Sequence, residues 1–210
     1  TTELISPADR RPEVDVVWAF NKPLDAAMLP ARLTRLTFGE HFNQSMDNVV
    51  WLESLRRMTF GYNYNQAIDK LTWPSGLQHL AFGKMFNHSI IGIVWPDSIK
   101  HLSFGGDFNQ PVVDVKWPSS LWFLSFGHTF NQPIGNVAWP AALNHVCFGH
   151  DFNQPITDVK WPSSLRHLKY GHDFNQRVDN VAWPSTLKQL TFGHNFNQPL
   201  TNVTWPSTLQ

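Results

Sequence analysis

Histidine is the residue whose spacing in this chain most resembles that of a chemical site. Four histidines recur at intervals of 22 residues: His128, His150, His172 and His194. Asp151 and Asp173 follow two of them, and imidazole and carboxylate groups are common ligands of zinc and related ions. The simpler interpretation is that histidine is a polar turn residue copied by duplication. We adopt it and predict no metal site and no cofactor, with these four histidines as the candidate ligands if a metal does bind.

A second histidine column is interrupted in a way that duplication does not explain. It contains His79, His101, His145 and His167. Trp122 and Phe123 stand where the preceding repeat has Lys100 and His101. Adjacent exposed aromatic side chains are the usual composition of a binding hot spot, although the two could instead pack on a neighbouring loop. We therefore predict a partner-binding surface formed by Trp122, Phe123 and this histidine column.

No set of residues predicts an enzyme. Every serine, aspartate or histidine that could act as a nucleophile or a base recurs as a member of a column. An enzyme needs one nucleophile and one base in a unique arrangement, and the sequence provides none.

The columns arise because the chain is a tandem repeat with a period of 22 residues and no insertion. The consensus is L-x-x-L-x-F-G-x-x-F-N-Q-P-I-x-x-V-x-W-P-x-S. Full units begin at Leu33, Leu55, Leu77, Ile99, Leu121, Leu143, Leu165 and Leu187. A fixed period of this length is typical of a solenoid, in which each unit buries its apolar face against its neighbours.

The units divide the chain into three parts. Residues 1–32 form an N-terminal cap with a degenerate first repeat, because a terminal coil must present one face to water. Residues 33–208 contain eight regular repeats, and residues 209–210 begin a further one. Since the last coil lacks a cap, we expect that its edge could support self-association.

Each unit shows its apolar pattern twice, which predicts two extended sides joined by two turns. The prolines after tryptophan and after F-N-Q interrupt every stretch long enough for a helix. The repeated glycine after the first side suggests a positive φ there, and the tryptophan column is expected to face the core. The sequence thus predicts a β-rich solenoid of nine 22-residue coils with parallel strands and little or no helix.

The asparagine of F-N-Q is predicted to form a structural ladder. Its amide can bond the backbone of its own turn and of the next coil, where turn groups would otherwise stay unpaired. The predicted ladder is Asn43, Asn65, Asn87, Asn109, Asn131, Asn153, Asn175 and Asn197.

The composition limits the classes of partner. The formal net charge is zero and 42% of residues are hydrophobic, which indicates a folded chain and gives no sign of a nucleic-acid partner. Cys147 is the single cysteine, so an internal disulfide is excluded. No run of 18 apolar residues predicts a membrane span.

The chain resembles the FNIP repeat family, found in many proteins of social amoebae and of giant viruses that infect amoebae. The resemblance rests on the F-N-Q-P-I core with L-x-x-L-x-F-G before it and W-P-x-S-L after it, and it covers about residues 13–210. The 22-residue unit is similar to a leucine-rich repeat, except that phenylalanine and asparagine occupy positions ten and eleven where that repeat has asparagine at nine. The resemblance implies a leucine-rich-repeat-like, right-handed array. It also implies a protein-interaction scaffold, attached in some members to an F-box or kinase domain.

We therefore predict a non-enzymatic scaffold that binds a protein partner, not nucleic acid or a membrane, along the outward strand face. The alternative is a structural or assembly component that stacks end to end or belongs to a particle. Either role suits a cytoplasmic or virion-associated protein.

Overall fold

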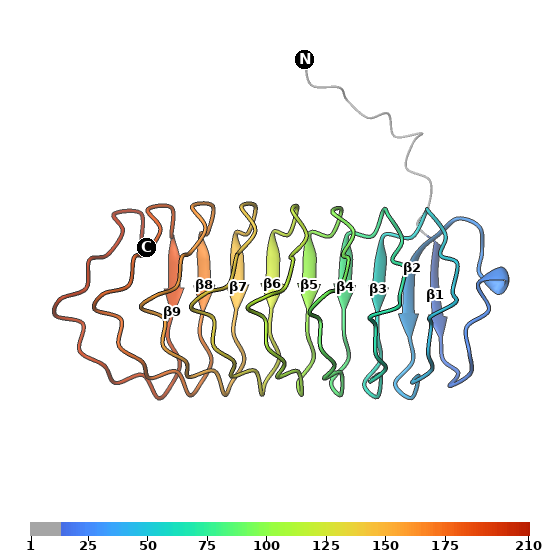
Figure 1. Ribbon diagram of the computed structural model, residues 1–210, viewed down its shortest axis with the longest axis horizontal. Helices are drawn as coiled ribbons and strands as arrows, with labels where there is room; N and C mark the ends of the chain where they lie inside the picture. Colours follow the sequence, from blue (N-terminus) through green and yellow to red (C-terminus); the bar gives the residue numbers. More distant parts are fainter. Residues whose placement is uncertain (1–13) are drawn as a thin grey trace, which may run out of the picture.

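The chain winds into a solenoid in which each turn contributes one strand to a single parallel sheet (Figure 1). The computed structural model describes residues 14–210, so the first part of the predicted cap, residues 1–13, lies outside the described residues. The strands are β1 (Val14–Trp18), β2 (Leu33–Phe38), β3 (Arg57–Thr59), β4 (His79–Ala81), β5 (His101–Ser103), β6 (Phe123–Ser125), β7 (His145–Cys147), β8 (His167–Lys169) and β9 (Gln189–Thr191). One short 3-10 helix, η2 (Ala26–Met28), is the only helix within residues 14–210. The predicted β-rich solenoid with parallel strands is confirmed.

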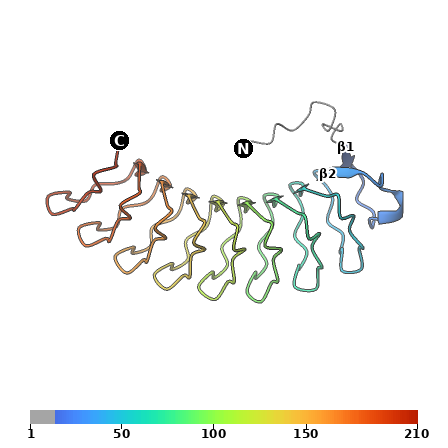
Figure 2. The same cartoon turned by 90° about the horizontal axis from the view of Figure 1, so that it is seen from above.

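The solenoid is curved, with the strands on its concave side (Figure 2). Parallel strand hydrogen bonds hold adjacent coils close together on that side. The loops on the opposite side spread apart along the convex surface.

Strand register is constant because every unit has the same length. Leu102 pairs with Leu124, and Leu124 pairs with Val146, so each residue faces the one 22 positions later. The register shifts only where β1 meets β2, between Val14 and Asp15. Equivalent side chains therefore form straight columns from β2 to β9.

The second side of each unit does not pair between coils. No strand forms on that side in the described chain, and its backbone bonds close turns within one coil, as from Val115 N–H to the Val112 carbonyl at 3.3 Å. The proline that follows every tryptophan of this column except Trp51 has no N–H to donate to a ladder.

The repeated glycines are needed for close approach and not for a positive φ, as the sequence had suggested. Within residues 14–210, Gly92 alone has positive φ, at 84°. A Cβ on Gly149 would lie 1.6 Å from the carbonyl oxygen of Gly127 in the preceding coil. The glycine column thus lets successive backbones touch.

Two phenylalanine columns fill the interior. The rings of Phe126 and Phe130 stack at 4.0 Å within one coil, and Phe130 stacks on Phe152 of the next at 6.1 Å. Most of the tryptophan column is buried or half-buried against this core, including Trp95, Trp117 and Trp161. Each aromatic ring therefore joins neighbouring coils by burial and by stacking.

Candidate binding surface

The concave face carries a column of aromatic and imidazole rings. Strand register places His79, His101, Phe123, His145 and His167 next to one another on β4 to β8. His79 stacks on His101 at 4.2 Å, and His145 stacks on His167 at 4.0 Å. The half-buried ring of Phe123 lies between the two pairs, 5.7 Å from His101 and 6.2 Å from His145.

Trp122 lies beside this column and is 41% exposed. Its ring is 4.2 Å from that of His145 and 5.6 Å from that of His101. The structure thus brings the aromatic pair together with the histidine column, and it leaves part of the indole exposed to solvent. We call Trp122, Phe123 and these four histidines the concave aromatic column.

Burial and nearby cations disfavour protonation of this column. Desolvation, followed by His101 and Arg57, lowers the pKa of His79 to about 4. Desolvation first, then Arg57 and Lys100, lowers the pKa of His101. Desolvation and His167 lower the pKa of His145. The three imidazoles are therefore neutral at pH 7 and offer apolar ring faces as well as ring nitrogens.

Charge is segregated although the chain is neutral overall. The strand side of each coil runs from its first leucine or isoleucine to the following phenylalanine or tyrosine. From Leu33 onward, the strand sides of all the coils together carry seven cations and no anion. The cations are Arg35, Arg56, Arg57, Lys100, Arg166, Lys169 and Lys188. Asp15 on β1 forms an ion pair with Arg35 at 3.0 Å. In the coils from Leu33 onward, the acidic residues lie on the turns and on the convex side, so the concave face is basic.

A shallow hollow of about 310 Å³ lies at the N-terminal end of the concave aromatic column. Arg57, His79, His101 and Phe123 contribute to its walls. Cationic, imidazole and aromatic groups meet there, which suits an extended segment that combines carboxylates with an apolar side chain.

The predicted asparagines lie in the turn that follows each strand. The side chains of all but Asn197 bond the next coil, and Asn197 donates its N–H to Asn175. Asn131 Oδ1 accepts bonds from the Asn153 N–H at 3.0 Å and from Gln154 Nε2 at 2.9 Å. The same side-chain acceptor serves the next coil's N–H for Asn21, Asn43, Asn65, Asn87, Asn109, Asn153 and Asn175. The asparagine thus has a structural role, because it pairs a backbone N–H of the next coil. This role explains why the asparagine recurs in every repeat.

A column of serine and threonine hydroxyl groups also bonds adjacent coils, and it was not recognised from the sequence. Thr186 Oγ1 donates toward the Leu165 carbonyl at 2.8 Å, and Ser98 Oγ donates toward the Leu77 carbonyl at 2.7 Å. The signal was present as the serine or threonine that ends W-P-x-S in most units. Its role depends on which carbonyl of the preceding coil lies opposite, and the sequence does not show this.

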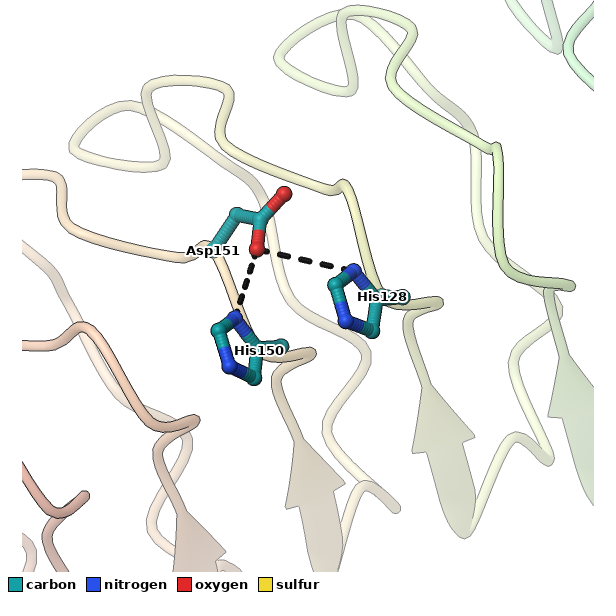
Figure 3. Close-up of side chains that lie close together, drawn as sticks. All are labelled: His128, His150 and Asp151. Carbon is teal, nitrogen blue, oxygen red and sulfur yellow. Dashed lines mark hydrogen bonds and ion pairs between the residues drawn. The ribbon is translucent and has the colours of Figure 1, made fainter.

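The other histidine column lies at the turn after the strands, together with the two aspartates. Figure 3 shows His128, His150 and Asp151 of this column. His150 Nδ1 lies 2.7 Å from Asp151 Oδ1, and His128 Nδ1 lies 3.5 Å from the same oxygen. Asp173 repeats the arrangement, 2.7 Å from His172 and 3.6 Å from His150. Each carboxylate thus lies between the rings of two successive coils. His194 stacks on His172 at 5.0 Å, but Asn195 follows it where an aspartate would complete the pattern.

Stacked parallel strands, a concave strand face and a short fixed repeat define a leucine-rich-repeat-like solenoid. The FNIP Repeat model matches residues 20–50, 53–85, 86–129, 152–193 and 174–210. The chain belongs to the FNIP repeat family.

Among solved structures, the chain is similar to CroV588 of the giant virus CroV, described as a novel circular LRR protein. The two share 43% sequence identity with a TM-score of 0.85, over 93% of this chain and 29% of CroV588. The chain therefore spans less than a third of the length of that protein. A leucine-rich repeat protein from Bacteroides ovatus is 12% identical over 87% of this chain and 61% of its own, with a TM-score of 0.21. No curated protein matches.

Within residues 14–210, no helix is both long enough and apolar enough to cross a membrane.

Proposed function

We propose that this protein is a non-enzymatic scaffold whose concave face binds an acidic, extended segment of a protein partner. The observation that carries the proposal is the position of Trp122 and Phe123 on a strand face that has seven cations and, from Leu33 onward, no anion. Aromatic residues that lie near the centre of an interface supply much of its affinity, and the surrounding charges select the partner and speed its association.

The chemistry of the face favours an acidic protein segment over nucleic acid. The cations are separated by histidines and by the aromatic pair, whereas affinity for nucleic acid grows with the number of phosphates that cations neutralise together. An extended peptide can instead place carboxylates on Arg57 and Lys169 and an apolar side chain on Trp122.

The random copolymer poly(Glu,Tyr) is a suitable probe, because it combines carboxylates with aromatic groups. We expect saturable binding to the wild-type protein by fluorescence anisotropy, weakened as salt screens the charges. Replacing Trp122→Gln together with Phe123→His introduces residue types already present in the same columns, at Gln78 and His101. This variant should bind the probe at least about tenfold more weakly while its melting temperature stays nearly unchanged.

The charge part of the proposal needs a matched pair of variants. Arg57→Glu with Lys169→Glu should weaken binding by a similar factor. Lys70→Glu with Lys160→Glu makes the same charge change at exposed positions away from the strand side and should leave binding unchanged. Equal loss in both variants, or tighter binding of oligo-dT than of poly(Glu,Tyr), would overturn the proposal.

A structural role is the second candidate, and the likeness to CroV588 supports it. That protein is described as circular, and the coils of this chain also curve, with their strands on the inner side (Figure 2). We expect a structural component to be recovered from its source within a ring or a larger particle, as seen by negative-stain electron microscopy. Recovery as a free monomer would exclude this role and favour the scaffold.

A further inference from the structure

The turn after the strands holds two overlapping groups of metal-ligating atoms outside the concave face. The first contains His128, His150 and Asp151, and the second contains His150, His172 and Asp173. In each group, one ligand atom from every residue lies within 4.8 Å of the other two. We propose that this His–Asp column binds one divalent transition-metal ion of the zinc type per chain.

The ligand atoms already converge on each carboxylate. Nδ1 of His150 and Nδ1 of His128 lie 2.7 Å and 3.5 Å from Asp151 Oδ1 (Figure 3). Tetrahedral ligands at zinc distances are about 3.4 Å apart, so the shorter of these contacts must lengthen by less than about 1 Å. The rings of His128 and His150 stack in parallel at 4.5 Å, so they must also tilt until both Nδ1 atoms point at one ion. The side chains of His128, His150 and Asp151 are between 37% and 61% exposed, which leaves room for that adjustment.

The proton balance of binding is simple. A neutral imidazole carries one proton, which must be on Nε2 for Nδ1 to coordinate a metal. The second ring nitrogen of each histidine points away from the carboxylate in Figure 3, so the proton can move there. Two imidazoles and one carboxylate provide three ligands, and solvent provides the fourth.

The shared residue sets the stoichiometry. His150 belongs to both groups, and its Nδ1 can coordinate one ion at a time. The flanking coils break the pattern on either side, because Asp107 follows Gly106 instead of a histidine and Asn195 replaces the aspartate after His194. We therefore expect one equivalent of metal to bind, not a metal in every coil.

Zinc chloride is the first probe, with isothermal titration calorimetry of the full chain as the measurement. We expect saturable binding of one equivalent, competed by Co²⁺ with visible absorption bands typical of tetrahedral coordination. Binding should weaken from about pH 7.5 to about pH 5.5, because protons compete for the imidazole nitrogens. No saturable binding, or equal binding of Ca²⁺, would overturn the proposal, since calcium prefers oxygen ligands alone.

His150→Gln removes a ligand from both groups and should abolish saturable binding. His194→Gln, in the same column but outside both groups, should bind zinc like the wild type. If His150→Gln proves poorly folded by circular dichroism, the double variant Asp151→Asn with Asp173→Asn tests the same prediction. Full binding by either of these ligand-removing variants, or its loss in His194→Gln, would show that the metal binds elsewhere.

Discussion

At the scale of single residues, the repeated asparagine and the repeated glycine make contacts between coils. Asn131 supplies one oxygen that receives two donors of the next coil, and Gly149 leaves room for the backbone of the preceding one. Neither contact exists within a single unit. The stability of the solenoid therefore depends on residues whose partners are 22 or 23 positions away.

Asn131→Ala should destabilise the protein by about 1 to 3 kcal/mol, because it leaves the Asn153 N–H and Gln154 Nε2 without their acceptor. Urea unfolding followed by circular dichroism measures this loss. Asn136→Ala, at an exposed position in the same coil, is the matched control and should cost less than about 0.5 kcal/mol. Equal effects of the two substitutions would show that the side-chain acceptor contributes nothing.

Gly149→Ala should cost at least about 3 kcal/mol, because its Cβ would lie 1.6 Å from a backbone oxygen of the neighbouring coil, and neither backbone can move aside alone. Gly135→Ala is the control, since the nearest atom to its Cβ, from Asp158, is 3.9 Å away. Thermal melts of both variants test the argument. A large loss in Gly135→Ala, or none in Gly149→Ala, would contradict it.

At the scale of the elements, the parallel pairing of three-residue strands stacks side chains that are 22 residues apart in the sequence. The short strands β4, β5, β7 and β8 each place one histidine on the concave face. Parallel pairing then brings the rings to within 4.2 Å in the pairs His79 with His101 and His145 with His167. Charging one ring of such a pair makes it harder to charge the other, so the sheet itself shifts the proton affinity of its side chains.

Stability should fall as the pH is lowered from about 6.5 to about 4, because the folded-state pKa values of His79, His101 and His145 are lowered. In this window the unfolded chain binds more protons than the folded chain, so acid favours unfolding. Below the folded pKa of His79, about 4, its contribution to the slope ends.

His79→Gln should make the pH dependence of the melting temperature shallower without changing its value at pH 8 by much, since Gln189 occupies the same column. Melting curves at a series of pH values compare the two proteins. An unchanged slope in the variant would mean that this column does not sense acid.

At the scale of the whole molecule, the array is one-dimensional. Each strand contacts only the strands before and after it in the sequence, and the register is constant from β2 to β9. Stability is then close to a sum of units and of interfaces between neighbours. The proposed binding surface departs from this regularity, because the pair Trp122 and Phe123 occurs in one coil only.

Deleting residues 121–142 removes one full unit and should give a folded, shorter solenoid with a modestly lower melting temperature, because Ser120 and Leu143 rejoin in register. Small-angle scattering should show a shortening of about 5 Å. The same protein should lose binding to poly(Glu,Tyr), since its aromatic pair is gone. Deleting residues 121–131, half a unit, is the control and should prevent cooperative folding, because the two apolar patterns fall out of register.

The 22-residue period alone determined the parallel β-solenoid, because identical unit length forces each side chain opposite its counterpart in the next coil. The same pattern located the columns of asparagine, tryptophan and histidine. It could not show how closely the backbones of successive coils approach, and for that reason the positive φ of the glycine column was predicted wrongly.

Only the tertiary structure decided how the columns face one another. Curvature places the strands on the concave side, and pairing gathers Arg57, His79 and Phe123 around one hollow. The coil path also inserts Asp151 between His128 and His150, which lie one unit apart in the sequence. Distances across coils depend on how tightly the glycine and asparagine turns pack, and this packing is a property of neighbouring units together and not of any one unit.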